Sequence, residues 1–353
     1  MKRTDLMTMD ARQNGEKVNP SAARPPPAGD TDGSSPSSQP TPRLRHHCGT
    51  RANAFMQRVA GACLPLAYLI GWFATWWFWL RDREARESSC DYLRRLEPNR
   101  SKISLLLRVH KHMYNYALSL IDCSAMLTGL GKKFTVACPN RDALLDAIQS
   151  PGGLLILTAH VGSIEIAAPR MSQLLGVRRA HFVMYQDMSD ETERFRAEKW
   201  RSLQTFNIIN SMDALAASIQ TARALMAGEV VGMRADRRVS DRYIPADVLG
   251  AEVRLPHGPF MAAVATGATV VFAFAFRTGY RRYELCVSMP RTYQVDDPDD
   301  KPRLAQRVAT EYASALSDAL RRFPLQWFNF YPFWEAASAP QQGARTAETS
   351  NTG

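Results

Sequence analysis

The sequence predicts an α/β protein in which a central sheet is flanked by helices. Short, uninterrupted apolar runs alternate with longer segments of helical periodicity, a pattern typical of strands buried between helices. Of the 353 residues, 45% are hydrophobic, which is enough for one large core. A further, uncharged segment near the N-terminus adds a predicted membrane helix to this fold.

The predicted domain begins with helices, and strands and helices then alternate along the chain. Apolar residues recur at three- and four-residue spacing from Ser101 to Leu127, which indicates an amphipathic helix. A short helix from Asp142 to Ser150 is stopped by Pro151, and Leu154 to Thr158 reads as a buried strand. Further strands are predicted at residues 181–185, 230–233, 269–276 and 283–288, and further helices at 189–203, 212–227, 258–266 and 303–323.

The two ends of the chain are predicted to be disordered. Residues 1–50 and 337–353 are rich in polar residues, proline and glycine, and such segments bury too little apolar surface to order themselves. Between them we expect a membrane-anchoring helix at residues 51–86 and one α/β domain at residues 87–336.

The anchoring helix is predicted from the segment Val59 to Leu80, which contains no charged residue and four of the seven tryptophans. Its length allows a helix that spans the bilayer. Its tryptophans equally favour an interfacial or re-entrant anchor, and a buried core helix is the third alternative. Arginines flank the segment on both sides, and those after it favour a cytoplasmic location for the C-terminal side.

The charge and the cysteine content limit the classes of partner, metal site and compartment that the sequence allows. A net charge of +10 suits nucleic acid, anionic lipid surfaces or phosphorylated substrates. The aromatic residues gather in apolar runs, so we predict a membrane and lipids and no nucleic acid. The six cysteines form no Cys-x-x-Cys pair, which indicates no metal site and a reducing compartment. His46, His47 and Cys48 lack a fourth ligand nearby.

Candidate catalytic residues follow the first buried strand, in the run Thr158-Ala159-His160-Val161-Gly162-Ser163-Ile164-Glu165. Sites of α/β enzymes lie at such strand ends. A carboxylate beside an imidazole fixes its tautomer, and the imidazole can then take a proton from a hydroxyl. The alternative is a hydrogen-bonded histidine at a strand end and a glutamate that merely starts a helix.

Three blocks resemble the lysophospholipid acyltransferase superfamily, and within it the bacterial lipid A biosynthesis acyltransferases. The first, from Thr158 to Glu165, is similar to the His-x4-Asp/Glu motif of that superfamily. The second runs from Gly232 to Arg238 and on to Pro259, and the third is Gln326 to Trp334. The resemblance covers about Phe55 to Trp334 and implies a fold of the glycerol-3-phosphate acyltransferase type.

The resemblance implies the reaction and its components. An acyl chain would move from a thioester of acyl carrier protein or coenzyme A to a hydroxyl of a lipid or glycolipid, with no cofactor. His160 would be the general base and Glu165 its orienting partner, at the cytoplasmic side of the bacterial inner membrane. A membrane-anchored lipid-binding protein without turnover is the alternative.

Substrate-binding residues are expected in the second block. Arg234, Arg237 and Arg238 surround Asp236 near a strand end and suit phosphate or an anionic head group; a solvated basic loop is the alternative. Gly258 and Pro259 complete this predicted set. Where the family carries Tyr-Arg-Pro this chain reads Tyr185-Gln186-Asp187, so lipid A itself is not assigned as the acceptor.

Overall fold

The computed structural model describes residues 50–175, 178–185, 206–238 and 241–334. Apart from Thr50, the tails predicted at residues 1–50 and 337–353 lie outside these ranges. So does the helix predicted at residues 189–203.

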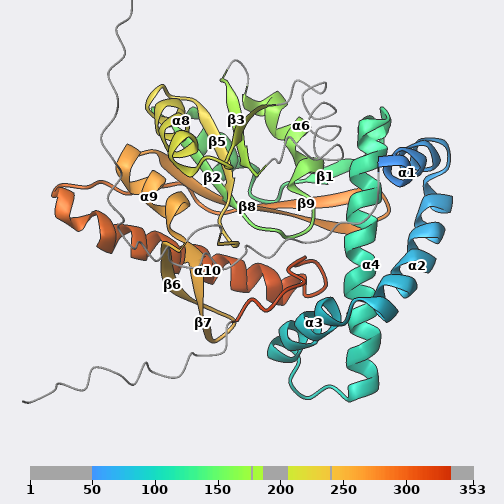
Figure 1. Cartoon of the computed structure of the whole chain (residues 1–353). Helices are drawn as coiled ribbons and strands as arrows, with labels where there is room; N and C mark the ends of the chain where they lie inside the picture. Colours follow the sequence, from blue (N-terminus) through green and yellow to red (C-terminus); the bar gives the residue numbers. More distant parts are fainter. Residues whose placement is uncertain (1–49, 176–177, 186–205, 239–240, 335–353) are drawn as a thin grey trace, which may run out of the picture. The chain divides into compact units, whose positions relative to one another are not determined.

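The predicted central sheet is confirmed, with eight strands among the described residues (Figure 1). Its order is β1-β9-β8-β2-β5-β3-β4, and β10 pairs with β8. The strand β2 lies at the centre and runs parallel to both neighbours, β5 and β8. The bounds are β1 Thr135–Ala137, β2 Leu154–Thr158, β3 Ala180–Met184, β4 Asn207–Asn210, β5 Val230–Arg234, β8 Thr269–Gly279, β9 Arg282–Val287 and β10 Arg291–Thr292.

Helices cover both faces of the sheet because side chains of β2 alternate between them. Leu154 and Ile156 pack in one core cluster with α5 (Arg141–Gln149) and α6 (Ile164–Leu175). Leu155 and Leu157 belong to the cluster on the opposite face. That face is covered by α8 (Ala214–Met226), α9 (His257–Thr266) and α10 (Lys301–Arg322). Apolar burial on both faces explains why the strand sequence is continuously hydrophobic.

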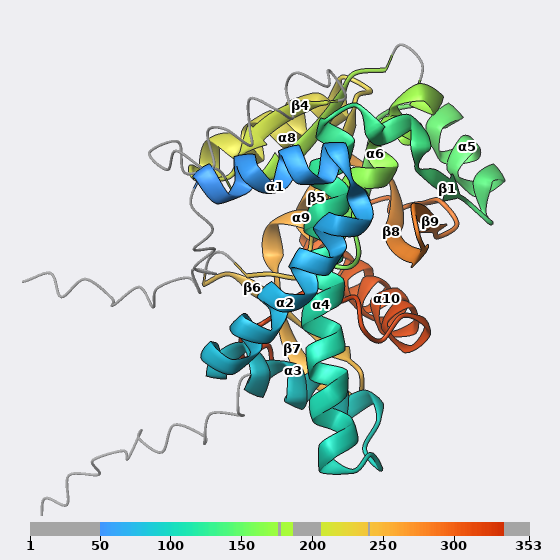
Figure 2. The ribbon, with the colours of Figure 1, turned by 90° about the vertical axis from the view of Figure 1, so that its right-hand side faces the viewer.

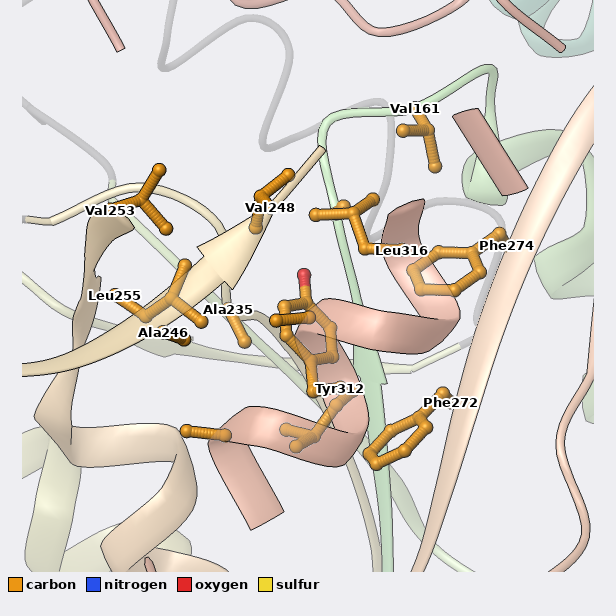
Figure 3. Packing of buried hydrophobic residues seen from close by; sticks show 14 of the residues in the cluster. Val161, Ala235, Ala246, Val248, Val253, Leu255, Phe272, Phe274, Tyr312 and Leu316 are labelled. Atoms are coloured by element: carbon orange, nitrogen blue, oxygen red, sulfur yellow. The ribbon is translucent and has the colours of Figure 1, made fainter. Parts of the chain in front are cut away.

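The core beneath the carboxyl end of β2 is centred on Tyr312 of α10 (Figure 3). Its ring packs against Phe272 and Phe274, at 5.6 and 6.1 Å between ring centroids. Its hydroxyl donates a hydrogen bond of 2.8 Å to the carbonyl oxygen of Thr158. The backbone of Thr158, the last residue of β2, is therefore held by the fully buried side chain of Tyr312.

A separate two-stranded hairpin, β6 (Tyr243–Val248) and β7 (Ala251–Pro256), packs on α10 and was not predicted. Its turn is Leu249-Gly250, and both residues have positive φ angles, 56° and 82°. Both strands are short and contain a proline, and because proline is depleted in strands, the sequence gives only a weak signal for them.

Four helices precede the sheet: α1 (Thr50–Ala62), α2 (Leu64–Arg81), α3 (Arg83–Leu96) and α4 (Lys102–Leu127) (Figure 2). The segment predicted as one anchoring helix is thus divided at Cys63, just before Pro65 of α2. Along α2 a stripe of small residues packs on α4. A Cβ on Gly71 would lie 2.7 Å from Ile121 Cδ1, so a side chain at residue 71 would require the end of the Ile121 side chain to shift. Short 3₁₀ turns at Leu130–Lys133 and Pro298–Asp300 complete the described elements.

The other face of α2 is apolar and exposed. Phe73, Trp77 and Leu80 are 66%, 58% and 65% exposed. Among the described residues, no helix combines the length and the hydropathy that a crossing of the bilayer requires. The prediction of a spanning helix is therefore not borne out. A helix with one buried and one exposed apolar face is also not a buried core helix, the third alternative.

Candidate active site

His160 lies in a tight loop between β2 and α6, and backbone hydrogen bonds hold that loop in place. The Phe328 amide donates to the His160 carbonyl (2.8 Å), and the Gly162 amide donates to the Gln326 carbonyl (2.7 Å). The Ser163 amide donates to the Ala275 carbonyl of β8 at 2.8 Å. The loop is therefore clamped between the sheet and the C-terminal segment.

Gly162 makes this clamp possible. Its φ angle is 50°, and a Cβ at this position would lie 1.9 Å from the carbonyl oxygen of Ala275. Only a residue without a side chain allows so close an approach of the two backbones. The glycine predicted to let the chain turn tightly is thus required by the contact with β8.

The carboxylate that holds His160 belongs to Asp236, which follows the neighbouring strand β5. Asp236 Oδ1 accepts a hydrogen bond from His160 Nδ1 at 2.8 Å, and Oδ2 accepts one from the His160 backbone amide at 3.0 Å. Since Nδ1 carries the proton, Nε2 keeps its lone pair and can accept a proton from a substrate.

Asp236 is fully buried and surrounded by donors from the C-terminal segment. Its Oδ2 also accepts hydrogen bonds from Trp327 Nε1 (3.0 Å) and Asn329 Nδ2 (3.2 Å). Burial alone would raise the pKa of this carboxyl, but His160, Arg237 and Trp327 outweigh it and hold the pKa well below its usual range. Asp236 is therefore an anion, fixed by its hydrogen bonds.

The imidazole of His160 is neutral at neutral pH. Burial, and then the positive charge of Arg237, lower the pKa of His160 to about 4, against the opposing effect of Asp236. A general base must be unprotonated when the substrate arrives, so this environment suits the predicted role.

Glu165 lies elsewhere than predicted. It stands in the first turn of α6 and forms an ion pair with Arg234 at the end of β5. No hydrogen bond or ion pair within the described ranges joins it to His160. The predicted pairing of His160 with Glu165 is corrected: at Nδ1 the structure has Asp236. The clamp on Gly162 and Ser163 directs α6 so that Glu165 faces β5.

The basic cluster divides into three environments. Arg234 forms an ion pair with Glu165. Arg237 donates two hydrogen bonds of 2.7 Å, from Nε to Asn329 Oδ1 and from Nη2 to the Phe328 carbonyl oxygen. Arg238 lies over the ring of Tyr243 in the hairpin, at 5.8 Å from the guanidinium carbon to the ring centroid. Arg237 thus positions the C-terminal segment, a role that the phosphate-clamp prediction did not include.

Gly258 and Pro259 open α9, directly after the hairpin. Gly258 is exposed and Pro259 is buried. In the described part of the chain, neither makes a hydrogen bond or ion pair to His160, so their predicted contact with substrate stays a prediction.

Among the described residues, no group of three or more His, Cys, Asp or Glu side chains could hold a metal ion.

The C-terminal aromatic segment, Gln326 to Trp334, contributes polar atoms to the site. The sequence did not predict this contribution. Trp327 and Asn329 donate hydrogen bonds to the Asp236 carboxylate. The Trp327 carbonyl in turn accepts a 2.7 Å hydrogen bond from Nε2 of the buried His112 on α4. An asparagine inside a run of buried aromatic residues was the one available signal, because a buried amide needs polar partners.

A neutral histidine held by a buried carboxylate, at the carboxyl ends of adjacent parallel strands, can take a proton from an attacking nucleophile, as in enzymes that use general-base catalysis. The family model of bacterial lipid A biosynthesis acyltransferases matches residues 129–335, more than half of the chain. The chain therefore belongs to this family and is an acyltransferase. A search of curated proteins finds no match for it.

Proposed function

We propose that this acyltransferase moves a fatty acyl chain from a thioester to a hydroxyl of a lipid or glycolipid, with His160 as the general base. The observation that carries the proposal is the hydrogen bond from His160 Nδ1 to Asp236. It leaves Nε2 as the proton acceptor and places an anion where it stabilises the imidazolium that forms.

The reaction then balances without a cofactor. Nε2 of His160 takes the proton of the acceptor hydroxyl while the hydroxyl oxygen attacks the thioester carbonyl carbon. The carbon–sulfur bond breaks, and the leaving thiolate takes the proton from the imidazolium. An ester and a free thiol result, and the histidine is neutral again.

Glu165 keeps a place in this proposal, through Arg234. The ion pair of Glu165 and Arg234 lies at the end of β5. In the sheet, Arg234 pairs with Thr158 of β2, which stands two positions before His160. A guanidinium fixed by a carboxylate is a rigid donor for a carbonyl or phosphate oxygen. We therefore propose that Glu165 orients Arg234 toward the donor, while Asp236 orients His160.

The donor is proposed to be a thioester of acyl carrier protein or coenzyme A. Both carry phosphate on the pantetheine arm, which the positive charges of Arg234 and Arg238 suit. Gly258 and Pro259 are proposed to border the same region. The chain's net charge of +10 also favours anionic partners over neutral ones.

The protein is proposed to bind the cytoplasmic face of the bacterial inner membrane through the exposed face of α2. That face carries Phe73, Trp77 and Leu80, and tryptophan and apolar side chains of a one-sided helix favour the bilayer interface. Arg81 lies over the Trp77 ring at 4.4 Å, at the end of the helix where a lipid phosphate would lie. Five described cysteines are free thiols, as in a reducing compartment.

Purified full-length protein tests the function directly. It is mixed with hexadecanoyl-coenzyme A or the matching acyl carrier protein and with membrane lipids from a lipid A-producing bacterium. Release of free thiol together with a new acylated lipid, seen by mass spectrometry, is the expected result. Lipid binding without thiol release would favour the alternative, a lipid-binding protein of the same fold without turnover.

A further inference from the structure

A narrow pocket lies beneath α6, on one face of β2, β5 and β3. Its walls are almost entirely apolar. They include Ile156 of β2, Ala168 and Met171 of α6, Phe182 and Met184 of β3, and Phe206. Apolar walls with few polar atoms are typical of sites for hydrocarbon ligands.

The pocket leads toward the catalytic residues. Side chains two positions apart in a strand point to the same face, so Ile156 and Thr158 face the pocket together. On β5, Val230 and Gly232 line it, and Arg234 follows on the same face. His160 and Asp236 each stand two residues beyond Thr158 and Arg234. The catalytic pair therefore lies just past one end of the pocket.

That end carries polar atoms without protein partners. Thr158 is fully buried, and its hydroxyl has no hydrogen-bond partner in the described ranges. The same holds for Nε of Arg234, whose outer nitrogen binds Glu165. Buried donors of this kind are costly unless a ligand or water satisfies them. A carbonyl oxygen entering from the site would satisfy them.

The opposite end of the pocket lies at the amino ends of β3 and β5. Ala180 and Val230, the first residues of these two strands, line the pocket there. An apolar chain that entered past His160 would therefore run along β3 and β5 toward these two residues.

Phe182 occupies the middle of the pocket. Its ring lies 5.3 Å from the Arg234 guanidinium carbon and 5.7 Å from the Phe206 ring centroid. It also covers Gly232, since a Cβ on this glycine would lie 2.8 Å from Phe182 Cδ2. A methyl group at residue 232 would thus push the ring into the remaining space.

We propose that this pocket holds the acyl chain of the thioester, and that Phe182 and Gly232 together set the chain length that the enzyme transfers. The thioester carbonyl lies at the end lined by Thr158 and Glu165, and the methyl end of the chain points toward Ala180 and Val230. The proposal rests on the proposed acyl transfer and adds to it the residues that select the substrate.

The test is a competition among acyl donors. Wild-type protein, Phe182→Leu and Gly232→Ala each receive an equimolar mixture of decanoyl-, dodecanoyl-, tetradecanoyl- and hexadecanoyl-coenzyme A, and mass spectrometry counts the acylated lipids. We expect Phe182→Leu to raise the ratio of long to short products by about tenfold, the usual effect of one or two methylenes in a pocket. Gly232→Ala should lower the same ratio.

Phe272→Leu is the matched control. Phe272 is equally apolar and packs on the opposite face of the sheet, against Tyr312. The substitution removes the same atoms from the core, so it should lower stability without changing the product ratio. If the product ratios of Phe182→Leu and Gly232→Ala equal that of the control, the proposed selection is wrong.

A second measurement does not depend on turnover. Hexadecanoyl-coenzyme A with a diazirine at the end of the chain is bound to wild-type protein and irradiated, and labelled peptides are mapped. Labels on the peptides that contain Met171 or Phe182 support the pocket even if no acceptor is acylated. Labels confined to other segments, such as the exposed face of α2, would overturn it.

Discussion

Asp236 Oδ1 lies 2.8 Å from Nδ1 of His160, although 76 positions of sequence separate the two residues. The two side chains meet because β2 and β5 are parallel neighbours and both residues stand two positions past the ends of these strands. This relationship, rather than the local spacing of His160 and Glu165, is the basis on which we propose His160 as the base.

Asp236→Asn should lower the rate of acyl transfer by about 10² to 10⁴, because an amide stabilises the imidazolium poorly and disturbs the tautomer. Glu165→Gln should cost less, about tenfold, since it releases only Arg234 from a half-buried ion pair. Steady-state kinetics of both purified variants compares them. A large loss for Glu165→Gln with little loss for Asp236→Asn would restore the pairing predicted from the sequence.

We expect Arg237 to control the pH range of activity through the pKa of His160. Burial and Arg237 lower that pKa to about 4, so the imidazole stays neutral, and transfer should persist, until the pH falls toward that value. Removing the charge in Arg237→Gln should raise the pKa, and the acidic limb of kcat/KM should move to higher pH. Arg237→Lys keeps the charge and serves as the control. An identical acidic limb in all three proteins would show that Arg237 does not act on His160.

Gly162→Ala should destabilise the protein strongly, because the new Cβ would lie 1.9 Å from the Ala275 carbonyl and the φ angle is positive. We expect a loss of at least about 2 kcal/mol in the free energy of unfolding, measured with urea. Gly258→Ala is the matched variant, since a Cβ there would meet no atom within 4 Å. Equal stability of the two variants would contradict the clamp on the His160 loop.

The exposed face of α2 should bind membranes. Replacing Phe73 and Trp77 by serine should weaken sedimentation with phosphatidylglycerol vesicles by more than about tenfold, since each buried aromatic side chain contributes about 1.5–3 kcal/mol. The control replaces Leu215 and Met226 of α8, which are 72% and 76% exposed, by serine. Equal vesicle binding by both double variants would argue against α2 as the anchor.

The sequence predicted much of the fold, because its signals were local. The continuous apolar run Leu154–Thr158 became β2, and the long amphipathic periodicity near the C-terminus became α10. The helix break at Cys63 was missed since the uncharged run hides it, although Pro65 marks a helix start. The hairpin β6–β7 was missed because its strands hold Pro245 and Pro256, and proline argues against a strand.

The candidate site was predicted in part. His160 was found from its place after an apolar strand, and Asp236 was named as a neighbour of substrate. Their contact could not be predicted, because strand order in the sheet is a tertiary property that no local spacing encodes. The ends of parallel strands do meet at one edge, so a carboxylate following any predicted strand was a candidate partner for His160. Choosing Asp236 over Glu165 required the register of β2 against β5.

The rate of acyl transfer by purified His160→Ala shows whether His160 is the general base. The substitution removes the base but keeps the backbone amide that binds Asp236, so near-ultraviolet circular dichroism should show an intact fold. We expect thiol release and ester formation to fall together by about 10² to 10⁴ relative to wild type. Transfer at close to the wild-type rate by a folded His160→Ala protein would contradict the role of His160 as the base.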